Sequence, residues 1–294
     1  MSNDDGHDDG HDDGHDDGYF GEDVAGRYDA DTSEEFDPGV VRRTVDFLAD
    51  QAGGGRALEL AIGTGRIAVP LAERGVPVAG IDMSRAMVAR LRAKPGGRDI
   101  PVTIGDIATT TAEGYAAGTA DGNASTDGIA GGNASTDGTA DGNGNGDGGG
   151  YALAYLVFNT VMNLATQESQ VACFRNAAAH LRPGGRFVVE VMVPELRKIP
   201  HGQNVVPFHT GPDGCSYTVY DTVTQDATCH YVTVTEDGRG QVTSTPFRYV
   251  WPAELDLMAQ LAGMRLRERW AGWSREPFTQ DSTRHVSVWE KEAV

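Results

Sequence analysis

Apolar residues occur along much of the chain in short runs that alternate with stretches of helical spacing. The short runs predict buried strands at residues 56–62, 77–82, 100–106, 151–158 and 186–193. The helical spacing predicts helices at residues 36–51, 66–74, 85–94 and 167–181. Strands that alternate with helices of about 10–15 residues are typical of a parallel sheet covered by helices on both faces. We therefore expect an α/β, doubly wound fold.

The last third of the chain has a different pattern, because polar and apolar residues alternate there in segments rich in Thr, Val and Tyr. Such segments at 215–224, 228–236 and 241–251 predict antiparallel strands. A helix at 252–263 and two closing strands at 264–273 and 284–292 follow. We expect one domain over residues 19–294 that carries a small antiparallel β insertion at about 205–250.

Two segments have a composition that cannot bury a core. Residues 1–18 contain a four-residue His-Asp-Asp-Gly repeat, and residues 112–150 are rich in Gly, Asn, Asp, Ser and Thr. Both are predicted to be disordered, the first as an acidic tail and the second as a low-complexity loop inside the domain. The histidines of the tail leave metal binding as the alternative for that segment.

The acidity of the chain is concentrated in these regions. The net charge is −19, of which residues 1–37 carry −14 and residues 112–150 carry −6, so the remainder is close to neutral. No basic tract is present to bind phosphates, and the acidic segments would repel them. This pattern argues against a nucleic-acid partner and favours a small-molecule substrate.

Features that the sequence lacks limit the expected cellular location and the expected ligands. No run of about 18 apolar residues is found, so we expect no membrane span. The acidic start does not resemble a secretory signal, and the three cysteines are odd in number and far apart. We expect a cytoplasmic protein without a metal site; the sequence leaves its oligomeric state open.

The stretch "LELAIGTGR" at 58–66 predicts a nucleotide-binding turn after the first strand. Its letters fit two patterns. Gly63, Gly65 and Ala68 match the dinucleotide fingerprint G-x-G-x-x-A, whereas Glu59, Ala61 and the two glycines match E-x-A-x-G-x-G. In an open parallel sheet the ligand binds beyond the carboxyl ends of the strands, which is where this turn lies.

Two acidic residues bear on the choice of ligand. Asp82 ends the second strand, 17 residues after Gly65, and a carboxylate there can accept both hydroxyls of an adenosine ribose. Glu59 stands before the turn, where an anion would oppose a pyrophosphate and favour a cationic ligand such as S-adenosylmethionine. The alternative for Glu59 is an ion pair with a neighbouring arginine such as Arg56.

Five segments in order then resemble class I S-adenosylmethionine-dependent methyltransferases, over about residues 19–111 and 151–294. They are "LELAIGTGR", "GIDMS", "VTIGDIA", "YLVFNTVMNL" and "LRPGGRFVVE". The resemblance implies a Rossmann-like, mostly parallel seven-stranded sheet whose final strand is antiparallel, with "RHVSVWEKE" as the candidate for that strand. It also implies S-adenosyl-L-methionine as the cofactor.

The resemblance assigns cofactor-binding roles to individual residues. Asp82 would bind the ribose, Met83 and Ile107 would lie beside the adenine, and Asp106 would accept from its amino group. The remaining cofactor-binding residues that we expect come from the first motif, the end of strand four and the N-terminal segment: Glu59, Ala61, Gly63, Gly65, Phe158, Asn159 and Tyr28. Core packing is the alternative for Met83, Ile107 and Phe158, and a turn role for Asp106.

Two features depart from the family pattern. Ala61 stands where the first motif usually has glycine, and its methyl group could crowd the ligand or tilt the turn. The 112–150 loop replaces a short helix between strands three and four.

The expected function is transfer of a methyl group to an oxygen or nitrogen of a small molecule by in-line displacement. A nicotinamide-dependent Rossmann oxidoreductase and a non-catalytic S-adenosylmethionine-binding protein are the alternatives. Candidates for a general base follow strand five, but the sequence selects none of them and the catalytic residues remain unknown: His201, His209, Tyr217, Tyr220, Asp221 and His230.

Overall fold

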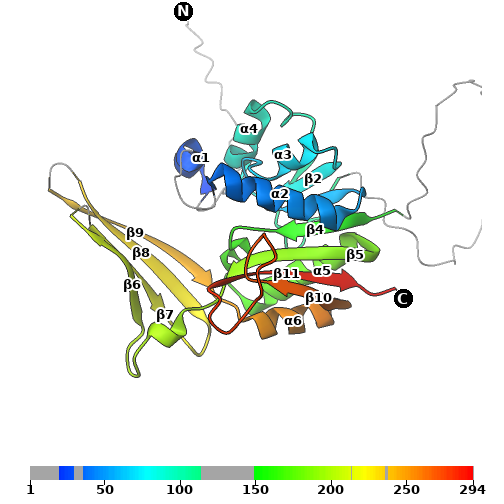
Figure 1. Ribbon diagram of the computed structural model, residues 1–294. Coiled ribbons are helices and arrows are strands. Elements are labelled where there is room, and N and C mark those ends of the chain that lie inside the picture. Colours follow the sequence, from blue (N-terminus) through cyan, green and yellow to red (C-terminus); the bar gives the residue numbers. More distant parts are fainter. Residues whose placement is uncertain (1–19, 30–35, 114–148, 213, 236–237, 294) are drawn as a thin grey trace, which may run out of the picture.

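The computed structural model describes residues 20–29, 36–113, 149–212, 214–235 and 238–293 (Figure 1). The tail at 1–18 lies outside these residues, as does the loop at 112–150 except for its first two and last two positions. Among the described residues no helix is long and apolar enough to cross a membrane.

A seven-stranded sheet forms the centre of the molecule, with the strand order β10-β11-β5-β4-β1-β2-β3. Its parallel strands are β1 (Ala57–Leu60), β2 (Val78–Asp82), β3 (Val102–Ile104), β4 (Tyr151–Leu156) and β5 (Leu181–Met192). Strand β11 (Arg284–Lys291) is inserted antiparallel between β5 and β10 (Met264–Trp270). The predicted fold class and the antiparallel final strand are confirmed.

Helices cover both faces of this sheet. On one face lie α2 (Pro38–Ala52), α3 (Ala68–Glu73) and α4 (Arg85–Ala93), and on the other lie α5 (Gln167–His180) and α6 (Pro252–Leu261) (Figure 1). Each face has its own cluster of buried apolar side chains. The central strands β1 and β4 are buried at every position, which explains why their sequences are continuous apolar runs rather than alternating ones.

The boundaries of the helices follow from their capping residues. The Asp37 side chain accepts hydrogen bonds from Gly39 and Val40 at the start of α2, and the Ser84 side chain accepts one from Met87 at the start of α4. The helix expected at 66–74 is shorter, since α3 begins at Ala68 after the glycine turn.

The predicted β insertion is a four-stranded antiparallel sheet in the order β6-β7-β8-β9. Its strands are β6 (Val205–Gly211), β7 (Gly214–Tyr220), β8 (Asp226–Val234) and β9 (Gly240–Arg248). The sequence pattern did not reveal β6, which contains a proline and is mostly exposed. The sheet extends away from the main body in Figure 1, while Val206, Tyr220 and Ala227 at its base join the main core.

Three short elements of the described part of the chain lie outside the two sheets and their covering helices. Helix α1 (Glu22–Tyr28) packs near α4, the 3-10 helix η3 (Thr160–Asn163) follows β4, and the 3-10 helix η4 (Leu196–Lys198) follows β5. The first two lie beside the carboxyl ends of the parallel strands. They therefore contribute directly to the cavity described next.

Candidate functional site

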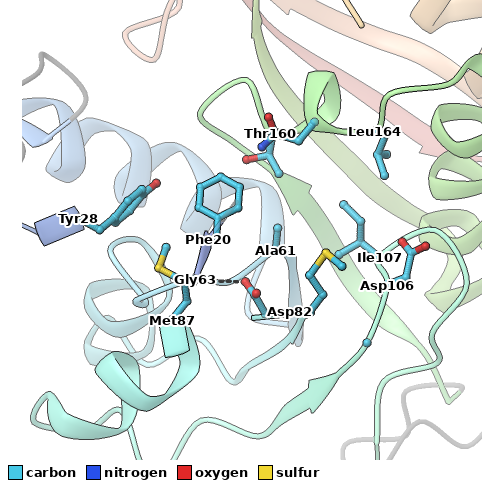
Figure 2. A pocket seen from close by; sticks show the side chains of 13 residues that line it. Phe20, Tyr28, Ala61, Gly63, Asp82, Met87, Asp106, Ile107, Thr160 and Leu164 are labelled. Carbon is cyan, nitrogen blue, oxygen red and sulfur yellow. Dashed lines mark hydrogen bonds between the residues drawn. The ribbon is translucent and has the colours of Figure 1, made fainter. Parts of the chain in front are cut away.

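A cavity of about 120 Å³ lies at the carboxyl ends of β1, β2 and β3 (Figure 2). Of the eleven cofactor-binding residues expected from the sequence, these line it: Tyr28, Ala61, Gly63, Asp82, Met83, Asp106 and Ile107. The lining also includes residues that sequence reasoning missed: Phe20, Met87, Gly105, Thr160, Asn163 and Leu164. The cavity thus gathers segments from the N-terminal helix to η3.

Asp82 joins the first two motifs at the floor of this cavity. Its carboxylate accepts hydrogen bonds from the backbone N–H of Gly63 at 2.6 Å and from that of Ser84 at 2.8 Å. Asp82 is 6% exposed, and Figure 2 shows its contact with Gly63 as a dashed line. An ionised carboxylate has about four lone-pair positions, so the bonds to Gly63 and Ser84 occupy only part of them.

Ala61 adopts a backbone conformation that suits glycine better than alanine. Its φ is 57°, in the left-handed region where a Cβ collides with the following carbonyl. Its methyl group lines the cavity. The departure from the family pattern at this position therefore has two physical effects, a strained backbone and a smaller cavity.

The wall opposite the first motif consists of Asp106 and Ile107, and helix α5 holds this wall in place. The side chain of Asn176 donates to the backbone carbonyls of Ile107, at 2.8 Å, and of Thr110. His180 accepts from the N–H of Ala112 through Nε2, at 3.0 Å. Asp106 itself accepts from Ala108, so it combines a turn role with a place in the cavity.

The N-terminal segment forms a third wall. Phe20 and Tyr28 both line the cavity, and the Phe20 ring lies between Tyr28 and Ala61 in Figure 2. The Ser84 hydroxyl donates to the carbonyl of Phe20 at 2.7 Å, which fixes this segment to the loop that carries Asp82. At 120 Å³ the cavity is smaller than the roughly 300–1,000 Å³ of most small-molecule sites, and these two rings are part of the reason.

Phe158 and Asn159 do not line the cavity, although they immediately precede a segment that does. The ring of Phe158 packs edge-on against Tyr28 and Phe36, and the guanidinium of Arg66 lies 4.9 Å from its centre. The side chain of Asn159 accepts from the backbone N–H of Met192. From this end of β4, the lining residues are instead Thr160, Asn163 and Leu164.

Glu59 and Gly65 lie behind the turn rather than in the cavity. The Tyr155 hydroxyl donates to Glu59 at 3.0 Å, and burial raises the pKa of the Glu59 carboxyl to about 8. Glu59 is therefore mainly protonated at neutral pH, which removes the charge on which its expected preference for a cationic ligand rested. Arg56, its alternative partner, lies over the Tyr151 ring. A Cβ at Gly65 would collide with the side chain of Leu91, so glycine is required at this position.

The candidates for a general base lie apart from the cavity. Tyr217, Tyr220 and His230 belong to the small sheet, where the His230 ring stacks on Tyr217 and bonds to Ser244. Asp221 accepts from two backbone amides in a turn. Within the described part of the chain, no group of three or more His, Cys, Asp and Glu side chains could hold a metal ion.

The order of the strands, the glycine turn after β1 and the acidic residues at the end of β2 and after β3 are features of a Rossmann-like fold. No protein-family model matches the chain. The chain is 26% identical over 244 residues to the cypemycin N-terminal methyltransferase of a Streptomyces species, covering 81% of this chain and 84% of that protein.

Solved structures of the same fold are also methyltransferases. The CcbJ methyltransferase from Streptomyces caelestis matches with a TM-score of 0.72 and 28% identity, over 95% of this chain and all of that one. The S-adenosylmethionine-bound CalS10, an amino pentose methyltransferase from Micromonospora echinaspora, shares the fold with a TM-score of 0.56 and 19% identity, over 91% and 95% of the two chains.

These findings indicate an S-adenosylmethionine-dependent methyltransferase, consistent with class I of these enzymes. Its cofactor is S-adenosylmethionine. The predicted cofactor and enzyme class are confirmed, whereas the role of the glycine turn in binding the cofactor stays a prediction.

Proposed function

We propose that this enzyme transfers the methyl group of S-adenosylmethionine to an amine nitrogen of a small molecule. The observation that carries the proposal is the similarity, over more than four-fifths of both chains, to a protein described as an N-terminal methyltransferase. An N-terminal methyltransferase uses an amine as its acceptor.

The cavity fits the cofactor in its chemistry. The buried carboxylate of Asp82 would accept the ribose hydroxyls, and Met83 and Ile107 would lie against the faces of the adenine. Asp106 would accept from the adenine amino group. The methionine part would lie over the turn at Ala61 and Gly63. When bound, the cofactor supplies an electrophilic methyl group on a sulfonium.

The ionisable groups of the cavity suit an amine acceptor. Among the described residues that line it, the ionisable side chains are Tyr28, Asp82 and Asp106, and no histidine is present. A neutral amine attacks through its own lone pair and releases its proton afterwards, so alignment and exclusion of water contribute most. An alcohol is far less nucleophilic and usually requires a base in contact with its hydroxyl.

The test is a methylation screen with S-adenosylmethionine that carries a deuterated methyl group. The full-length enzyme is incubated with paired amines and alcohols of the same carbon skeleton, including short peptides with a free N-terminus, and products are detected by mass spectrometry. We expect labelled methyl groups on amines only. Methylation confined to the alcohols would refute the proposal.

A second measurement tests the cofactor independently of the acceptor. Calorimetry with S-adenosylhomocysteine reports cofactor binding without any acceptor, and NADH serves as the control ligand. We expect the first to bind and the second not to. The same experiment with Met83→Ala tests the adenine wall, because loss of apolar contact there should weaken binding about 10-fold.

A further inference from the structure

The chain makes an unusual turn where it leaves the central sheet after β4. Phe158 and Asn159 have φ values of 60° and 58°, so two successive residues with side chains adopt the left-handed conformation. Asparagine tolerates this region, whereas phenylalanine rarely adopts it. Such backbone persists only where the surrounding structure holds it, and it is concentrated at functional sites.

Two side chains hold this turn against β5. The backbone N–H of Phe158 donates to Oε2 of Glu190 at 2.9 Å, and Oδ1 of Asn159 accepts from the backbone N–H of Met192 at 2.7 Å. The regular pairing of β4 with β5 ends before these bonds, at Leu156 and Val189. The two side-chain bonds therefore continue the connection between the strands after the ladder has stopped.

The turn decides what reaches the cavity. It directs the ring of Phe158 away, toward Tyr28 and Phe36, and it starts η3, from which Thr160 lines the cavity. Figure 2 shows Thr160 and Leu164 across the cavity from Asp82. The wall made by η3 is thus separate from the wall that would hold the ribose.

We propose that Glu190 and Asn159 are positioning residues for methyl transfer, which act by fixing this turn and through it the η3 wall of the cavity. The proposal rests on the cofactor site described above. Glu190 lies at the end of β5 with 8% of its surface exposed, and it touches the turn rather than the cavity. Transfer needs the acceptor aligned within about an ångström, so a looser turn would slow the reaction by roughly 10- to 100-fold.

The first test compares Glu190→Gln with Glu190→Leu in the full-length enzyme. Glutamine keeps an oxygen that can accept from Phe158, whereas leucine fills the space without an acceptor. We expect Glu190→Leu to lower the single-turnover transfer rate about 10- to 100-fold while the affinity for S-adenosylhomocysteine stays within about 3-fold. Glu190→Gln should restore the rate.

Hydrogen exchange supplies a readout that needs no acceptor substrate. The amide of Phe158 should exchange faster in Glu190→Leu than in Glu190→Gln or the native enzyme, because only leucine removes its partner. Glu290→Gln is the matched control. That carboxylate lies on β11 of the same sheet and bonds to Arg265 and Arg267, so neither exchange at Phe158 nor the transfer rate should change.

Asn159→Gly gives an independent variant that is not expected to threaten folding, since glycine adopts the left-handed conformation without strain. It removes only the bond to Met192, and we again expect slower transfer with unchanged affinity for S-adenosylhomocysteine. Equal rates in all variants, a loss of affinity as large as the loss of rate, or no rescue by Glu190→Gln would overturn the proposal. The rates are measured with whichever acceptor the methylation screen identifies. An oxygen acceptor would therefore refute the proposed amine acceptor, and the comparison of rates would still test Glu190 and Asn159.

Discussion

The carboxylate of Asp82 is bonded to the backbone N–H of Gly63 across 2.6 Å, which joins the end of β2 to the glycine turn after β1. The other carboxylate oxygen accepts from Ser84, the capping residue of α4. The side chain that we propose as the ribose ligand therefore also fixes the backbone around the ligand.

Replacing Asp82 with alanine should therefore have two effects. Affinity for S-adenosylhomocysteine should fall at least 100-fold, and the free energy of unfolding should fall by about 2–4 kcal/mol because the buried N–H of Ser84 and the half-buried N–H of Gly63 lose their acceptor. Calorimetry and urea denaturation measure the two quantities. Weaker binding without any loss of stability would show that the hydrogen bonds to Gly63 and Ser84 contribute little.

Asp106→Ala separates these two effects. Asp106 is exposed and accepts a backbone hydrogen bond from Ala108. We expect the free energy of unfolding to change by less than about 1 kcal/mol, while affinity for S-adenosylhomocysteine falls about 10-fold through loss of the adenine contact. Unchanged affinity would remove Asp106 from the cofactor site.

Ala61→Gly should improve the site. The substitution relieves about 1–2 kcal/mol of left-handed strain, offset by about 0.5–1 kcal/mol for the greater freedom of glycine in the unfolded chain. We expect a protein at least as stable as the original, with tighter binding of S-adenosylhomocysteine because a methyl group leaves the cavity wall. Thermal melting and calorimetry would show it, and weaker binding would contradict it.

Gly63→Ala is the reciprocal control for that substitution. Gly63 has a φ of 54°, and a Cβ there would lie 3.5 Å from the Met87 side chain, an ordinary contact. The change therefore adds left-handed strain without a collision, and we expect the free energy of unfolding to fall by about 1–2 kcal/mol. If the free energy of unfolding rises in Ala61→Gly and falls in Gly63→Ala, backbone conformation rather than local packing determines the stability of the turn.

The sequence was sufficient to predict the parts of the fold and site that depend on local pattern. Apolar runs and capping residues located the parallel strands and the helices. Asp82 was predicted to lie at the ligand edge because it ends a buried strand, and Asp106 was predicted from the family resemblance; both line the cavity. Strand β6 escaped because Pro207 and its exposed neighbours give no alternating pattern.

The missed residues depend on geometry that the sequence does not display. The left-handed turn at Phe158 and Asn159 moves these side chains away from the cavity and brings in residues further along, and nothing in "VFNTVMN" marks phenylalanine as left-handed. Phe20 is part of the cavity because Ser84 binds its carbonyl, a contact across 64 residues. The raised pKa of Glu59 could not be predicted either, because the burial that causes it follows only from the tertiary structure.

Glu59→Gln should change how stability depends on pH. Burial raises the pKa of Glu59 to about 8 from 4.5, so its contribution to stability is fully present below pH 4.5 and is lost as the pH rises through 8. Glutamine stays neutral and can still accept from Tyr155, so the variant should lose less stability between these limits, by up to a few kcal/mol. Urea denaturation at pH 5, 7 and 9 measures it, and parallel curves for the two proteins would contradict it.

His285 should contribute to the loss of stability at acidic pH. Its side chain is fully buried on β11, its Nδ1 bonds to Ser287, and in the described part of the chain its Nε2 has no hydrogen-bond partner. Burial lowers the pKa of His285 to about 3 from 6.5, and the nearby Arg269 adds to the shift. The contribution of this neutral ring to stability is therefore present above pH 6.5 and lost as the pH falls toward 3.

His285→Leu removes that titration and the unpaired nitrogen while it keeps an apolar side chain in the same space. We expect the variant to lose less stability than the original protein between pH 6.5 and 4, by about 3 kcal/mol from the 1.36 kcal/mol of each pH unit. His201→Leu, at an exposed position, is the control and should leave the profile unchanged. Denaturant unfolding across this range decides the matter, because an equally steep loss in His285→Leu would mean that other groups cause the acid sensitivity.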